Sequence, residues 1–194
     1  MKMTRKYVAS HEAGHVVVAT ILNVGFTDVY IADSFNHVGE GGAIHYTPSS
    51  FHPIFDAKSE VILKMAGEAG VRLYAGRKAG KITLNNILGG GMWTDYKLAK
   101  DITKDMLARI KTGKMYPSYL DEFCVKGEFS VDKFIDSCFL AAYDILSANR
   151  EFHARVTKAL VETGELGFVQ VKTLAIAAAR EKFQIEKAAR AGSR

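Results

Sequence analysis

Apolar residues recur every three or four positions along the first 24 residues of the chain. Val8 and Val18 lie on the same predicted helical face as His11 and His15. This spacing is typical of an amphipathic helix, in which residues three and four apart share one side. We therefore expect a helix that turns both histidines toward the core and ends at Gly25.

Two short segments after this helix alternate apolar and polar residues, as half-buried strands do. They read FTDVYIAD at 26–33 and GGAIHYT at 41–47, with a glycine-rich stretch between them. The alternation predicts a small sheet.

The segment NNILGGGMWTD, at 85–95, contains three consecutive glycines, so we expect it to be an irregular loop. Thr94 is a good N-cap residue, and a helix is predicted from it over 95–111. The inward stripe of this helix is expected to contain Leu98, Ile102, Met106 and Ile110.

The remaining patterns are helical. Apolar spacing predicts a helix over 57–75, and Gly67 and Gly70 inside it indicate close packing against another element. Residues 131–163 contain one long helix or two shorter ones, and a last helix is expected from about Gln170. The order of elements predicts an α+β fold, mostly helical, in which a helix and a small sheet precede a helical bundle.

The composition is that of a globular chain with a substantial core. Of 194 residues, 48% are hydrophobic and 24% are charged, which favours one domain. The formal net charge is +5, but basic and acidic residues are interleaved, which argues against nucleic-acid binding as the main function. Apolar runs fall far short of the ~18 residues that a membrane span needs. With two cysteines and no visible signal peptide, we expect a cytoplasmic protein.

Residues 11–15 read HEAGH, which matches the H-E-x-x-H pattern of zinc peptidases. On a helix, His11 and His15 differ in direction by about 40°, so both can bind one zinc ion at about 2.0–2.1 Å. Glu12 points about 100° away from His11, where it can act as general base on a metal-activated water. The alternative is a chance match, with two core histidines satisfied by hydrogen bonds.

A catalytic zinc site needs a third protein ligand and one open position. Val18 and Ile21 stand where the extended pattern HExxHxxGxxH has its glycine and third histidine, so that pattern fails. Donor chemistry alone does not separate Glu68 from Asp95. A carboxylate in the first turn of a helix stays ionised, which favours Asp95, although capping is its simpler role. The remaining donors are Glu60, Glu68, Asp95, His37, His45 and His52.

Four segments together resemble the peptidase domain of the FtsH-type ATP-dependent zinc proteases. HEAGHVVVA at 11–19 is similar to the family pattern H-E-A-G-H-A-V-V-A. AGEAGVRLYAG at 66–76 is similar to G-G-R-x-A-E-E-L-x-x-G, and GGGMWTDYKLAKD at 89–101 to T-G-A-x-N-D-L-x-x-A-T. A weaker likeness follows in AAYDILSANREFHARVTKALVETGEL, so the resemblance covers roughly residues 5–175.

The resemblance implies a zinc ion held by His11, His15 and Asp95, with Glu12 as general base. It also implies that the strand at 41–47 is an edge strand that binds an extended substrate; the alternative is an ordinary strand of the sheet. One departure lies in the second helix, where Val71 and Arg72 stand in place of the two glutamates of the family pattern.

The family couples its peptidase to an ATPase, whereas this chain has no GxxxxGK[ST] motif. We therefore expect an ATP-independent zinc metalloendopeptidase acting on unfolded proteins or peptides, with a separate ATPase or adaptor and a homo-oligomer as candidate assemblies. Residues 1–175 are predicted to form the peptidase domain, and 176–194 the end of a helix with a basic tail. The alternative function is a non-catalytic, peptidase-like regulatory protein that binds zinc or a partner.

Overall fold

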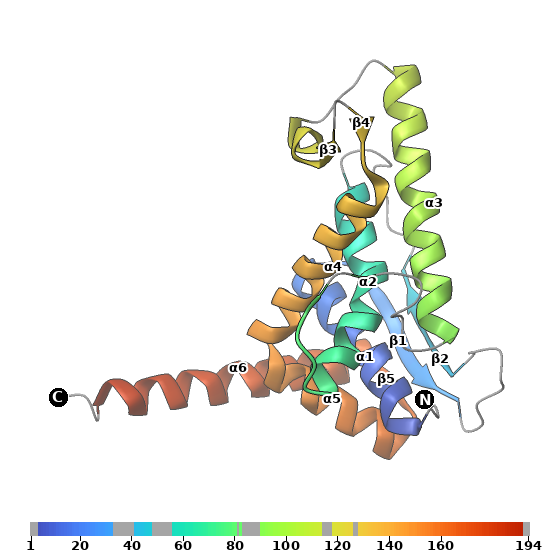
Figure 1. Cartoon of the computed structure of the whole chain (residues 1–194). Helices are drawn as coiled ribbons and strands as arrows, with labels where there is room; N and C mark the ends of the chain where they lie inside the picture. Colours follow the sequence, from blue (N-terminus) through green and yellow to red (C-terminus); the bar gives the residue numbers. More distant parts are fainter. Residues whose placement is uncertain are drawn as a thin grey trace.

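The computed structural model describes residues 4–32, 41–47, 56–80, 82, 90–113, 118–125 and 128–191. Helices dominate these residues and a three-stranded sheet lies beside them, so the predicted α+β class with a helical majority is confirmed (Figure 1). The elements are α1 (Arg5–Ile21), β1 (Phe26–Ile31), β2 (Gly42–Tyr46), α2 (Ala57–Tyr74), α3 (Gly90–Gly113), the 3-10 helix η1 (Ser118–Phe123), β3 (Cys124–Val125), β4 (Glu128–Phe129), α4 (Val131–Ala148), α5 (Arg150–Thr163), β5 (Glu165–Gly167) and α6 (Phe168–Ala191).

Helix α1 lies at the centre of the fold and contacts α2, α4, α5 and both long strands. Every residue from Val8 to Ala19 is buried. The prediction of a single inward face is therefore wrong, because neighbouring elements cover the other faces too. The helix ends at Ile21, earlier than predicted, because Asn23 adopts a left-handed conformation with φ 56°. The amide of Val24 then donates to the Ala19 carbonyl at 2.8 Å and closes the helix end.

The sheet is antiparallel, with strand order β2-β1-β5. Val29 in the central strand pairs with Ile44 on one side and Leu166 on the other. Both predicted strands are present, and β2 lies at the sheet edge, as expected. Strand β5 was not predicted, because three residues are too few to show an alternating pattern.

Helices α1 and α2 approach each other backbone to backbone. A Cβ atom at Gly14 would lie 2.2 Å from the carbonyl oxygen of Ala66, and one at Gly70 would lie 2.5 Å from that of Ser10. Only glycine fits at such a distance, so the close packing predicted for the glycines of α2 is confirmed. This contact positions the α2 backbone against the side chains of α1.

Helix α3 differs most from the prediction. It begins at Gly90, so Thr94 lies inside the helix and does not cap it, and residues 90–95 are not a loop. Leu98 is 41% exposed, although it was predicted to face inward. Met106 is buried as predicted, and Ile102 and Ile110 are partly buried against the core. Tyr96, Ala99 and Thr103 are also buried, although they were not predicted to face inward. Packing against α2 outweighs the glycine cost of about 1 kcal/mol per residue, which the local sequence alone cannot reveal.

The C-terminal half forms separate helices. Residues 131–163 make two, α4 and α5, which meet at Asn149. Helix α6 starts at Phe168, close to the predicted Gln170, and extends away from the other elements (Figure 1). Helix η1 and the short β3–β4 hairpin were not predicted. Among the helices described here, none is long and apolar enough to cross a membrane.

The contact between α1 and α2 predicts the effect of a single methyl group. Gly14→Ala should lower the free energy of unfolding by about 1–3 kcal/mol, because the new Cβ overlaps the Ala66 carbonyl and the helices must separate. Urea unfolding measures this change. Gly80→Ala is the control, since its Cβ would be 3.9 Å from the nearest atom, in Arg72. Equal stability of the two variants would contradict the close approach.

Candidate metal centre

His11 and His15 lie one turn apart on α1 and point to the same side. Both are buried, and their Nε2 atoms are 3.2 Å apart. Their rings meet edge to face, with centroids 4.8 Å apart. The predicted pairing of the two imidazoles is therefore present in the structure.

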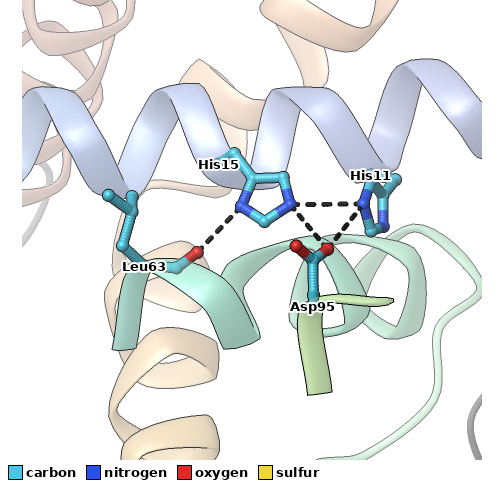
Figure 2. Close-up of polar contacts among 4 residues, drawn as sticks. All are labelled: His11, His15, Leu63 and Asp95. Carbon is cyan, nitrogen blue, oxygen red and sulfur yellow. Dashed lines mark hydrogen bonds and ion pairs between the residues drawn. The ribbon is translucent and has the colours of Figure 1, made fainter. Parts of the chain in front are cut away.

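Asp95 reaches the two histidines from α3 (Figure 2). Its Oδ2 atom lies 3.1 Å from Nε2 of His11 and 3.1 Å from Nε2 of His15. Two tetrahedral zinc ligands at about 2.0–2.1 Å from the metal are about 3.3–3.4 Å apart, so this triangle has nearly the size of one tetrahedral face. Within the described residues, this is the one group of three or more histidine, cysteine or acidic side chains that could hold a metal ion.

A backbone carbonyl of α2 orients His15. Nδ1 of His15 donates to the carbonyl oxygen of Leu63 at 2.8 Å (Figure 2). A hydrogen bond at Nδ1 leaves Nε2, which faces Asp95 and His11, as the nitrogen that can bind a metal ion. This is the usual arrangement of a metal-binding histidine, whose second nitrogen is held by a hydrogen bond.

The Nδ1 side of His11 is held by packing instead of a hydrogen bond. Its buried Nδ1 has no hydrogen-bond partner among the described residues. Gly67 of α2 lies directly against the ring, and a Cβ at this position would be 2.5 Å from Nδ1. Any side chain at Gly67 would therefore displace His11.

The cluster attracts positive charge. Burial alone would lower the pKa of His11, but the hydrogen bond to Asp95 and the negative charges of Glu12, Asp95 and Glu68 raise this pKa to about 9. Burial would raise the pKa of Asp95, yet His15 and His11 hold it well below its usual value. Asp95 lies beyond the first turn of α3, so the expectation that the helix terminus keeps it ionised is wrong. The adjacent histidines do so.

Glu12 is buried beside the cluster, next to β2. Burial raises its pKa, and the charges of His11 and His15 oppose this shift. A Cβ at Gly42 would lie 2.8 Å from Cγ of Glu12, so the edge strand passes directly by this carboxylate. A buried carboxylate and an edge strand are thus adjacent.

The other predicted donors do not join the cluster. Glu68 accepts a hydrogen bond from Nε of Arg72 at 2.6 Å, and both side chains are buried. His45 is exposed and lies 2.7 Å from Asp28. Glu60 on α2 is outside the group as well. His37 and His52 lie outside the described residues.

No family model matches the chain. Over 168 residues it is 23% identical to "ATP-dependent zinc metalloprotease FtsH 2" of Phytoplasma mali, an alignment that covers 81% of this chain and 23% of that protein. Over 178 residues it is 24% identical to the protein of the same name in a Thermoanaerobacter species, covering 90% of this chain and 33% of that protein. The chain is distantly similar to FtsH-type zinc metalloproteases. It spans a quarter to a third of the length of these relatives.

The ion pair on α2 clarifies the departure from the FtsH pattern. Where G-G-R-x-A-E-E-L has an arginine and, four residues later, a glutamate, this chain has Glu68 and then Arg72. The two charges are exchanged, but the four-residue spacing that allows an ion pair is kept. Here the pair forms, and the Arg72 guanidinium lies 4.9 Å from the centroid of the Phe139 ring.

Tyr46 is a residue of this region that sequence reasoning missed. It shares a face of β2 with Gly42, because alternate residues of a strand point the same way. Burial, together with the negative charges of Asp95 and Glu12, raises the pKa of Tyr46 well above its usual value. The phenol therefore keeps its proton and can donate a hydrogen bond. The alternating pattern could not distinguish Tyr46 from an ordinary strand residue.

The raised pKa of His11 predicts a pH dependence for the metal-free protein. The pKa rises from 6.5 to about 9 on folding, so protonation of His11 stabilises the fold fully below pH 6.5. This contribution, on the order of 3 kcal/mol, is lost as the pH rises from 6.5 through 9. Urea unfolding in the presence of a chelator at several pH values measures it. Asp95→Asn should lose less stability between pH 6.5 and 9, because the hydrogen bond and charge that raise the pKa of His11 are weakened. A wild-type stability that is flat or rises over this range would contradict a raised pKa at His11.

Proposed function

We propose that this chain is the zinc peptidase unit of an endopeptidase that hydrolyses unfolded proteins or peptides. The observation that carries the proposal is the convergence of His11, His15 and Asp95, with Glu12 buried beside them. The distant similarity to FtsH-type metalloproteases supports the same chemistry independently.

His11, His15 and Asp95 would hold the zinc ion through Nε2, Nε2 and a carboxylate oxygen. The donor set fits, since neutral imidazoles and an ionised carboxylate are zinc ligands and three protein ligands leave a position open. When bound, zinc acidifies water and polarises a carbonyl group. The hydrogen bond from His15 to Leu63 keeps the correct nitrogen of this ligand directed at the centre.

Glu12 would serve as general base. Burial moves the pKa of Glu12 in the direction of neutral pH. This shift suits a group that accepts a proton from water and returns it to the leaving amine. Its position beside Gly42 supports this role, because the proton would be moved next to the strand on which the substrate lies.

Strand β2 would bind the substrate by adding an extended peptide to the sheet edge. Such pairing uses backbone hydrogen bonds and is tolerant of sequence, which suits unfolded chains. Delivery of folded substrates would require a separate ATPase or adaptor. Assembly of this chain into a homo-oligomer is a further part of the proposal.

Metal analysis of purified protein tests the ligand assignment. Wild type should contain about one zinc ion per chain after dialysis, and Asp95→Ala should lose it, because a catalytic site needs three protein ligands. Glu68→Gln should retain zinc, since Glu68 pairs with Arg72. Asp101→Ala removes an exposed acid from the same helix as Asp95 and should also retain it. Full zinc occupancy in Asp95→Ala would exclude Asp95 as the ligand.

Casein cleavage tests the general base. Glu12→Gln should keep its zinc but lose at least about 100-fold in rate, because general-base catalysis contributes 10²–10⁴-fold. If wild type loaded with zinc cleaves neither casein nor a peptide library, the endopeptidase proposal fails. The alternative, a non-catalytic zinc-binding or partner-binding regulatory protein, would then hold.

A further inference from the structure

A cavity lies between α1, α2 and α5, away from the cluster of His11, His15 and Asp95. Its volume is about 440 Å³, within the range of about 300–1,000 Å³ typical of small-molecule sites. The first turn of α1 contributes Lys6, the end of α2 contributes Leu73 and Tyr74, and one face of α5 completes the wall. No residue of the metal cluster lines it, so the cavity is a separate feature of the fold.

The floor of this cavity is buried and uncharged. Leu73, His153 and Thr157 are each less than 7% exposed. Nε2 of His153 donates to the carbonyl of Ser10 at 3.0 Å, and burial lowers the pKa of this histidine, so it stays neutral. An apolar group can therefore be buried there without displacing a charge.

The rim, in contrast, is mainly cationic. Lys6, Arg150 and Lys158 line it, with Glu162 as the one acid. Lys158 and Glu162 form only an exposed pair at 3.9 Å, which contributes little. In the described part of the chain, neither Lys6 nor Arg150 has a carboxylate within ion-pair distance. The rim thus has positive charge that is not neutralised locally.

We propose that this cavity binds a small amphipathic carboxylate. The apolar body would cover Leu73, and the acid group would lie at the cationic rim. A medium-chain fatty acid and the free C-terminus of a peptide ending in leucine share this chemistry.

Isothermal titration with the full chain tests the proposal. Octanoate should bind one to one, and octanol should bind at least about ten-fold more weakly, because it lacks the charge.

Arg150→Glu should weaken octanoate binding by at least about ten-fold, whereas Arg180→Glu, the same change on the exposed part of α6, should leave it unchanged. Ala154→Trp fills the cavity and should abolish binding, and Ala179→Trp is its exposed control. Circular dichroism checks that each variant folds.

Acetyl-Ala-Leu-Leu, as free acid and as amide, tests whether the carboxylate comes from a peptide C-terminus or from a fatty acid. Tighter binding of the peptide acid than of octanoate supports the site with a chain terminus as ligand, and the reverse supports it with a free carboxylic acid. The proposal is overturned if wild type binds neither acid, or if Arg150→Glu or Ala154→Trp binds as well as wild type.

Discussion

The backbone contact between α1 and α2 is the constraint on which the candidate site depends. Gly14 meets the Ala66 carbonyl, and Gly70 meets that of Ser10, so the helices lie closer than side chains would allow. At this distance the Leu63 carbonyl reaches the ring of His15, and Gly67 leaves just enough room for that of His11. The orientation of both imidazoles thus follows from the absence of side chains at the interface.

The second determinant is electrostatic. Glu12, Asp95 and Glu68 place three carboxylates in or near a buried space, and Arg72 pairs with one of them. The remaining negative potential raises the pKa of His11 to about 9. A divalent cation would relieve the same potential, because buried charges are stable only when they are paired or bound to metal. Proton binding and metal binding at this site would therefore compete with each other.

Three of the segments that resemble the FtsH pattern, in α1, α2 and α3, lie side by side in the structure. The departure from that pattern lies in α2. His11, His15, Glu12 and the edge strand lie in one region built from α1, α2, α3 and β2. In α2 the acidic residue, Glu68, precedes the basic one, Arg72, whereas the family pattern has them in the opposite order. The two side chains form an ion pair here. The Arg72 guanidinium also lies against the Phe139 ring, so the charge that replaces a glutamate of the family pattern has buried partners.

The sequence by itself determined the local features: the helical spacing of His11 and His15, the strand at 41–47, and the helices whose apolar residues repeat regularly. It also limited the candidates for a third ligand to a few acids and histidines. Among the candidates that the structure describes, Asp95 of α3 lies within 3.1 Å of both rings. The tertiary structure decided where α3 begins, how completely α1 is buried, and that a backbone carbonyl orients His15. These features depend on contacts between residues far apart in the chain, which local spacing and propensity do not encode.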